Sequence, residues 1–222
     1  MEKEIANALF RCNLFKNMTF TDIENALYGI NQKIMTLQKN DILYLSGDPC
    51  RYADIVINGE LAARMCGLSG RQVEIIRIRH GELIAPCFMF ASDNRIPVDI
   101  EVCERTSILR IPLECTKRLI DENRIIRENM LKILSDISSY LVTKMGILSL
   151  MTVREKVIYF LRSEAIEQKC LTIRLDKSRQ HIADSFAIQK YSLLRCLAEL
   201  SKDRIIEVNG KEIKILDLKR LR

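Results

Sequence analysis

The sequence predicts an α+β protein, in which an antiparallel β-roll is followed by one long helix and then by a winged helix-turn-helix. Three observations predict this order. Short strand-like runs separated by turn residues fill residues 33–112. Residues 122–150 contain neither glycine nor proline until Gly146, and they repeat apolar residues at helical spacing. Residues 175–216 then combine a short helix, a tight turn, a longer helix and a hairpin.

These patterns divide the chain into a β-roll sensor (1–121), a dimerisation helix (122–150) and a winged helix-turn-helix (151–222). Apolar residues make up 48% of the 222, enough for separate cores. No run of 18 apolar residues occurs, and the first residues lack the apolar stretch of a signal peptide. Eight cysteines are scattered without any Cys-x-x-Cys pair. We therefore expect a cytoplasmic protein with reduced thiols and no membrane span.

The first part is compatible with helices over residues 2–10 and 20–30, and strands follow. Each expected strand ends near residues that tolerate tight turns. The strand expected at Tyr52–Ile57 precedes Asn58-Gly59, and the strand expected at Val73–Ile78 precedes His80-Gly81. The expected strands are Tyr52–Ile57, Val73–Ile78, Val98–Val102 and Ser107–Ile111. Their spacing indicates an antiparallel barrel or roll.

The long helix carries an apolar stripe wider than the seam of a two-stranded coiled coil, because three rows repeat every seven residues. One side of the stripe is free to face an identical helix while the other packs on the roll. The alternative is a helix buried within a monomer. We expect a homodimer, since a helix-turn-helix generally needs two half-sites. The expected interface residues are Ile126, Met130, Ile133, Leu134, Ile137, Tyr140, Leu141 and Leu148.

The helix-turn-helix begins at Ser178, whose hydroxyl is expected to cap the first helix. Ile182 and Ala183 face inward, and residues 186–188 form the turn. In the second helix, four leucines recur at three- and four-residue steps, so we expect all four to be buried. They are Leu193, Leu194, Leu197 and Leu200.

The start of the second helix is the part that enters the major groove of DNA in such motifs. Arg195 is expected to reach a guanine edge and Lys190 a phosphate. A hairpin that turns at Asn209-Gly210 supplies the wing. The alternative is a plain helical hairpin packed into a core. The expected DNA-binding residues are Arg179, Gln180, Gln189, Lys190, Tyr191 and Arg195.

Charge favours the same placement of the DNA-binding site. Residues 151–222 hold 16 Lys and Arg against 10 Asp and Glu, whereas residues 1–150 hold 19 of each sign. The whole net charge of +6 therefore belongs to the C-terminal part. A basic domain beside a neutral one suits attraction to phosphates, although an ordinary solvated basic surface is the alternative.

Roll, long helix and winged helix in this order resemble the Crp/Fnr family of bacterial transcription regulators. Several segments carry the resemblance over nearly the whole chain: Leu14-Phe15-Lys-Asn-Met, Gly47-Asp48, Asn58-Gly-Glu-Leu61, His80-Gly-Glu-Leu-Ile84 and Ser178-Arg-Gln-His-Ile-Ala183. More narrowly, residues 51–60 and 84–91 resemble regulators of Bacteroidetes, including the HcpR group. The resemblance implies a roll similar to a cyclic-nucleotide-binding domain. It also implies an activator that works with RNA polymerase.

The resemblance assigns roles to several DNA-binding residues. Arg179 matches a family position that contacts DNA, and Lys190, Tyr191 and Arg195 match the base-reading positions. The family often has Arg-Glu where this chain has Lys190-Tyr191, which implies a different operator.

The residues that bind cyclic nucleotides in the family are replaced here. Pro86 stands where those members place a ribose-binding Glu, and Ile96-Pro97 stands in place of the phosphate-binding Arg-Ser. Arg95 lies one position early, and Leu141-Val142 replaces a hydroxyl on the long helix. An apolar pocket without its arginine cannot neutralise a cyclic phosphate. We therefore expect that cyclic AMP is not the effector, unless Arg95 compensates by a shift of register.

Other effectors are constrained by the residues available. Cys12 is the only cysteine near the N-terminus, which disfavours an iron–sulfur cluster that needs four thiolates. Haem is a candidate cofactor, with His80 and Met145 as ligand candidates, although His80 equally suits a turn and the methionines suit a core. The expected effector pocket is apolar and consists of Ile84, Pro86, Cys87, Met89, Leu141 and Met145.

Two other classes of function compete with this interpretation. No catalytic triad spacing, glycine-rich phosphate loop or His-x-x-Glu-His pattern occurs, so we expect no enzyme. The alternative to a DNA-binding regulator is an effector-binding dimeric sensor or scaffold that has lost DNA binding. The Lys190-Tyr191 departure keeps this alternative open.

Overall fold

The computed structural model describes residues 3–67, 70 and 72–221. The chain forms two compact units, Met1–Ser139 and Tyr140–Arg222, which we call the roll unit and the DNA-binding unit. The boundary falls inside the long helix rather than at either of its ends. Each unit has its own buried core.

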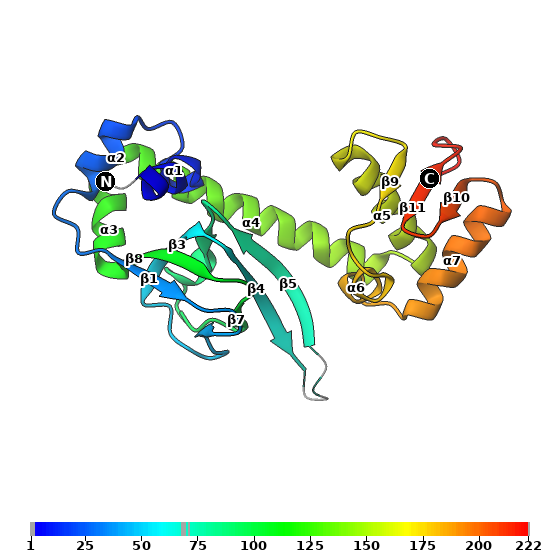
Figure 1. Ribbon diagram of the computed structural model, residues 1–222, viewed down its shortest axis with the longest axis horizontal. Coiled ribbons are helices and arrows are strands. Elements are labelled where there is room, and N and C mark those ends of the chain that lie inside the picture. Colours follow the sequence, from blue (N-terminus) through cyan, green and yellow to red (C-terminus); the bar gives the residue numbers. More distant parts are fainter. Residues whose placement is uncertain (1–2, 68–69, 71, 222) are drawn as a thin grey trace. The chain divides into compact units, whose positions relative to one another are not determined.

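The roll unit begins with helices and continues with antiparallel strands (Figure 1). Thr19 caps α2 through a reciprocal capping box with Asp22. The elements are α1 (Lys3–Arg11), η1 (Asn13–Phe15), α2 (Phe20–Leu27), β1 (Lys33–Leu37), β2 (Ile42–Tyr44), β3 (Tyr52–Asn58), β4 (Glu60–Cys66), β5 (Gln72–Arg79), β6 (Leu83–Ile84), η2 (Pro86–Phe88), β7 (Asp99–Val102), β8 (Thr106–Pro112), α3 (Leu113–Glu122) and the first half of α4 (Arg124–Leu150).

The strands form two four-stranded antiparallel sheets, in the orders β1-β8-β3-β6 and β2-β7-β4-β5. The expected roll is therefore confirmed, with the four predicted strands appearing as β3, β5, β7 and β8. The turn between β3 and β4 requires glycine at position 59. The φ of Gly59 is +93°, and a Cβ there would overlap Thr106 and the Arg105 carbonyl. Only glycine fits that position without displacing the chain.

An ion pair between neighbouring strands of the first sheet, β3 and β8, contacts a tyrosine of the second sheet. Asp54 on β3 is buried and accepts from Arg110 Nε and Nη2 at 2.8 and 2.7 Å. The Tyr44 hydroxyl on β2 donates to the same carboxylate at 2.7 Å. Burial and the Asp54 carboxylate raise the pKa of Tyr44 well above its usual range. The Arg110 guanidinium also lies over the Tyr52 ring, with 4.4 Å between its carbon and the ring centre.

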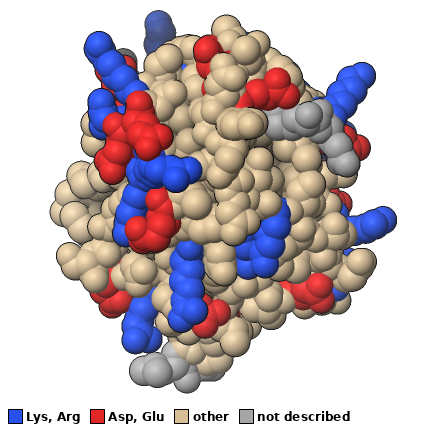
Figure 2. Space-filling model, turned by 90° about the vertical axis from the view of Figure 1, so that its left-hand side faces the viewer, with Lys and Arg blue, Asp and Glu red and all other residues tan. Residues whose placement is uncertain are grey.

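The surface of the roll carries mixed charge. Figure 2 looks at the side of the molecule that carries α2 and α3 in Figure 1, and there Lys and Arg intermingle with Asp and Glu. This agrees with the zero net charge of residues 1–150. That face offers no single-sign patch for a polyanion.

The long helix starts later than the sequence suggested. Helix α3, which was not predicted, occupies Leu113–Glu122, and α4 begins at Arg124 instead of residue 122. Asn123 separates them, because its Oδ1 accepts from the backbone N–H groups of Ile125 and Ile126 at 3.0 and 3.1 Å. By length and composition alone α4 would suffice to cross a membrane, but the core helix of a soluble protein and a signal sequence pass the same test.

The DNA-binding unit contains the last turns of α4, then α5 (Val153–Glu167), β9 (Thr172–Arg174), α6 (Arg179–Ser185), α7 (Lys190–Lys202), β10 (Ile206–Asn209) and β11 (Glu212–Ile215). The wing is three-stranded, in the order β10-β11-β9, because the unpredicted strand β9 pairs with β11. The predicted helix-turn-helix and wing are confirmed.

Candidate nucleic-acid interface and sensor site

The helix-turn-helix is built as its sequence predicts. The Ser178 hydroxyl accepts from the backbone N–H of His181 at 3.1 Å and so caps α6. Ile182 and Ala183 are buried beneath α7. Ala187 takes a φ of +52°, and the Ile188 N–H donates to the Ala183 carbonyl at 3.0 Å. The turn is therefore fixed by the backbone, which sets the crossing of the two helices.

Helix α7 presents a polar face at its N-terminal end. Lys190, Tyr191 and Arg195 are exposed there, whereas Leu193, Leu197 and Leu200 are buried. The prediction for Leu194 is wrong, because 42% of it is exposed. A position one residue after a buried leucine is turned by about 100° on a helix, and Leu194 thus shares the face of Lys190 and Arg195. Apolar side chains on such a face contact thymine methyl groups.

Arg195 is held by a carboxylate one turn further along α7. Its Nε donates to Glu199 Oε1 at 2.9 Å, and this contact raises the pKa of the guanidinium. Both side chains are exposed. The pair orients the arginine fork while leaving its other nitrogens available for a base edge.

The remaining predicted DNA-binding residues surround this helix. Gln189 is the exposed N-cap residue of α7, without a side-chain cap. Gln180 is exposed on α6, and its Nε2 donates to Asp184 Oδ1 at 3.1 Å. Arg179 is half-buried: its Nη2 donates to the carbonyl of Gly210 in the wing at 3.0 Å, and burial lowers the pKa of its guanidinium. The structure thus connects the start of α6 to the wing.

The wing differs from its prediction by one residue in register. Asn209 pairs with Glu212, so Gly210 and Lys211 form the two-residue loop instead of Asn209 and Gly210. Burial of Ile206, Ile213 and Ile215 fixes this register, since a shift by one residue would turn these side chains to the other face. The exposed Lys211 is therefore at the tip of the wing.

The last turns of α4 pack within the DNA-binding unit. Ile147 is buried in its core, and Lys156 Nζ of α5 donates to the Leu148 carbonyl at 3.0 Å. Lys144 Nζ lies 4.9 Å from the centre of the Phe186 ring, in the turn between α6 and α7. Thr152 and Glu155 form a capping box that starts α5. The end of the long helix and the helix-turn-helix therefore form one body.

The outer residues of α4 follow a heptad spacing. Leu131, Leu134, Ser138, Leu141, Met145 and Leu148 are three or four residues apart, and we call them the outward row. Within this row the half-buried Leu134 also packs against the core of the roll unit. Leu131, Leu141 and Met145 are more than half exposed, as is the neighbouring Tyr140.

A second row of α4 faces the chain's own roll. Ile126 and Met130 are buried in the core of the roll unit, with the half-buried Ile133 packed against it. Their assignment to a dimer interface is therefore wrong, because the roll already covers them. Ile137, half-buried, follows the same row one turn later.

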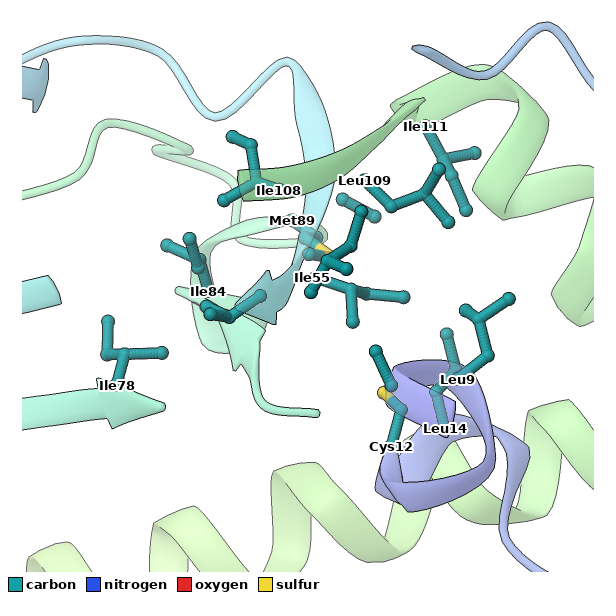
Figure 3. Close-up of a cluster of buried hydrophobic side chains, with 14 of the residues drawn as sticks. Leu9, Cys12, Leu14, Ile55, Ile78, Ile84, Met89, Ile108, Leu109 and Ile111 are labelled. Atoms are coloured by element: carbon teal, nitrogen blue, oxygen red, sulfur yellow. The ribbon is translucent and has the colours of Figure 1, made fainter. Parts of the chain in front are cut away.

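The predicted effector pocket is only partly open. Ile84 and Met89 are 1% and 2% exposed, and they lie among Ile55, Ile108 and Leu109 in the closed core (Figure 3). They fill that core and are not open to a ligand, which corrects the prediction for these two residues.

Other members of the predicted pocket remain accessible. Pro86 and Cys87 are half-buried in η2, which Ala85 begins at a left-handed φ of +51°. Leu141 and Met145 are exposed and belong to the DNA-binding unit. A ligand site that includes them remains a prediction.

Two side chains at or beside the positions that match nucleotide-binding residues differ in exposure. Ile96 is fully buried. Arg95 is exposed, and its Nη1 donates to the Gly47 carbonyl at 3.4 Å while its Nε lies 3.9 Å from Asp93. Arg95 therefore makes weak, solvent-exposed contacts with its own chain.

The thiols and histidines give no sign of a metal centre. Burial raises the pKa of Cys12 to about 11 and that of Cys50 to about 11. His80 Nδ1 hydrogen-bonds the Ile57 carbonyl in the turn after β5. Within residues 3–67, 70 and 72–221, no three His, Cys, Asp or Glu side chains are grouped to hold a metal ion. Haem binding through His80 and Met145 remains a prediction.

A capped helix-turn-helix with a wing, joined by a long helix to a β-roll, defines a two-domain DNA-binding regulator. Comparison with known proteins agrees with this class. Residues 34–123 match the cyclic nucleotide-binding domain family, and residues 155–222 match the Crp-like helix-turn-helix domain family. Together the two matches support a transcription regulator of the Crp/Fnr type.

Individual relatives are distant in sequence. The transcriptional activator protein anr of Pseudomonas aeruginosa is 24% identical over 206 residues, which cover 90% of this chain and 83% of that protein. A CooA mutant from Carboxydothermus hydrogenoformans shares the fold with a TM-score of 0.68 at 18% identity, covering 93% and 90% of the two chains. The c-di-GMP responsive regulator CLP of Xanthomonas campestris has a TM-score of 0.64 at 18% identity, covering 87% and 97%.

Proposed function

We propose that this protein is a homodimeric, sequence-specific DNA-binding regulator whose α7 helix reads the major groove. The observation that carries the proposal is the exposed face of α7 beside the wing, with Lys190, Tyr191, Leu194 and Arg195 on one end of the helix. Arg195 supplies a guanine-reading fork, and Leu194 an apolar contact to thymine. Gln180 and Gln189 flank this face on α6 and at the start of α7.

The dimer forms through the outward row of α4, together with Tyr140. Apart from Ser138 this row is apolar, and the chain leaves Leu131, Leu141 and Met145 more than half exposed. A heptad row of this kind buries its apolar surface against an identical helix. Two-fold pairing would then present two recognition helices to two half-sites of an operator.

The effector is a molecule other than cyclic AMP. Pro86 and the buried Ile96 cannot bind a ribose or a cyclic phosphate, and Arg95 is engaged with Gly47 and Asp93. The structural relative CLP responds to c-di-GMP, whereas a relative from Silicibacter pomeroyi is named for cAMP binding, so this fold accommodates different ligands. Half-buried Pro86 and Cys87 remain the roll residues proposed to line the effector site.

The cellular role follows from the family. A relative is named a transcriptional activator, and we propose the same sign of regulation here, through contact with RNA polymerase in the cytoplasm. No catalytic role is proposed.

Selection of binding sites from random duplex DNA tests the proposal. We expect an enriched two-fold-related sequence, and we expect Arg195→Ala to weaken binding to it by about 1–3 kcal/mol and to relax one base position. Arg154→Ala is the matched control, because Arg154 also pairs with an exposed carboxylate of this unit, Asp203, at 3.5 Å. Failure to enrich any sequence would favour a sensor or scaffold that has lost DNA binding.

A further inference from the structure

Lys144 lies where the long helix meets the helix-turn-helix. It belongs to the last turns of α4, and its Nζ is 4.9 Å from the centre of the Phe186 ring. Phe186 directly follows α6 and is 7% exposed, and the next residue, Ala187, takes the left-handed φ of the turn toward α7. A side chain of α4 thus contacts the turn that sets how α6 and α7 cross.

The Phe186 ring is held in place from a second side. It makes edge-to-face contacts with Tyr159 and Phe160 of α5, at centroid distances of 6.4 and 6.0 Å. Aromatic pairs with this geometry stabilise each other beyond the area that they bury. The ring therefore offers α4 a fixed face, because its packing against α5 determines its orientation.

The ammonium of Lys144 is attracted to this ring rather than to a carboxylate. The side chain is half-buried, and burial together with the nearby Lys177 lowers the pKa of the ammonium. Among the described residues no carboxylate pairs with it. Burial and a like charge both disfavour an ammonium at this position, so the ring face is the contact that favours it.

The DNA-binding unit also contains part of the outward row. Leu141, Met145 and Leu148 belong to the same unit as Lys144 and α7. The way the helix-turn-helix sits on the last turns of α4 therefore determines where the two recognition helices of a dimer point. Lys156 joins α5 to the Leu148 carbonyl at 3.0 Å, whereas Lys144 reaches the turn itself.

We propose that Lys144 is a positioning residue, whose contact with Phe186 fixes the helix-turn-helix on the end of α4 and so sets the half-site spacing that the dimer accepts. The proposal rests on the proposed function, since it requires a dimer that binds DNA. It goes further by assigning the choice of spacing to a side chain outside the base-reading face of α7. A cation–π contact corresponds to about a two- to thirtyfold factor in an equilibrium constant.

The test compares the selected two-fold site with the same site carrying one extra base pair at its centre. The insertion moves one half-site by about 3.4 Å and turns it by about 35°. The spacing ratio is the affinity for the selected site divided by the affinity for the inserted site. We expect Lys144→Met, which keeps the length of the side chain, to lower this ratio about two- to thirtyfold. The general effect of losing one positive charge cancels in the ratio, because it weakens binding to both duplexes alike.

Two further variants separate positioning from a general effect. Lys144→Arg keeps a cation over the ring and should retain the wild-type spacing ratio. Lys132→Met is the matched control, because it removes a lysine of α4 that pairs with Asp136 at 3.5 Å in the roll unit. It should leave the ratio unchanged.

A double-variant comparison tests the contact itself. Phe186→Leu keeps an apolar side chain but removes the ring, and it should lower the spacing ratio about as much as Lys144→Met does. The two substitutions together should lower it no further, since they remove the same interaction. Thermal denaturation shows whether Phe186→Leu folds, and if it does not, the comparison of Lys144→Met with Lys144→Arg and Lys132→Met decides alone.

The outcomes distinguish this proposal from the function on which it rests. An unchanged ratio in Lys144→Met, an equal fall in Lys132→Met, or a ratio in Lys144→Arg as low as in Lys144→Met would overturn the positioning role and leave DNA binding intact. Additive falls in the double variant, or a wild-type ratio near one, would do the same. A wild-type protein that binds no DNA would overturn both proposals.

Discussion

Leu141→Ala tests the proposed dimer. Full burial of a leucine side chain stabilises by about 1.5–3 kcal/mol. Leu141 is 56% exposed within its own chain. About half of that energy, roughly 1–1.5 kcal/mol per protomer, is therefore available at an interface. A two-fold interface contains the residue twice, so the substitution should cost about 2–3 kcal/mol of dimer stability.

That loss corresponds to a rise in the dimer dissociation constant of about 30- to 150-fold. Sedimentation equilibrium over a series of protein concentrations measures it directly. Ile166→Ala is the control, because Ile166 is 75% exposed on α5 and lies off the outward row; it should change the constant by less than about threefold. A Leu141→Ala variant that dimerises as tightly as this control would refute the reasoning, as would a wild-type protein that stays monomeric.

Three further outcomes follow from the structure. Asp54→Asn should destabilise the roll by about 3–5 kcal/mol and lower its melting temperature by roughly 10–20 °C, because it removes the counter-charge of Arg110. A loss of stability below about 1 kcal/mol, as expected for an exposed ion pair, would contradict the buried cluster. In the folded protein at pH 8, iodoacetamide should label the exposed Cys66 and Cys170 and spare Cys12, whose pKa of about 11 keeps it protonated. Mass spectrometry detects the labelled cysteines, and equal labelling of Cys12 would show that its thiol is accessible. Calorimetry should detect no cyclic AMP binding, and micromolar affinity would overturn the assignment of Pro86 and Ile96.

Local patterns in the sequence predicted the elements well, because the signals are themselves local. The serine cap at 178 and the leucine spacing of α7 depend on neighbours within a few residues. These interactions stay the same whatever the rest of the chain does. The order of roll, long helix and winged helix could accordingly be predicted from the sequence.

Choices between equivalent faces could not be predicted in the same way. Heptad arithmetic finds several apolar rows on α4, but only the fold decides that Ile126 and Met130 contact the roll while Leu141 and Met145 remain exposed. Leu194 likewise fits the leucine pattern and yet lies on the polar face of α7. In each case a rotation of one residue on the helix changes the face.

Contacts distant in the sequence were also beyond prediction. Strand β9 pairs with β11 some forty residues later, and its three residues carry no distinctive pattern. The contact of Arg179 with Gly210 depends on where the wing folds back, and no spacing rule relates the two positions. The burial of Ile84 and Met89 follows from packing against β3 and β8, which the sequence of the segment itself does not encode.

The central claim is that the DNA-binding unit recognises a two-fold DNA site as part of a dimer. Sedimentation of the wild-type protein with a duplex carrying its selected site measures the number of chains bound, and titration at several salt concentrations measures the slope. The account predicts two chains per duplex and a higher affinity for the selected site than for unrelated DNA. It also predicts a slope of log K against log salt of several units, which becomes smaller when Arg195 and Arg179 are replaced by alanine. One chain per duplex, or equal affinity for all sequences, would contradict it.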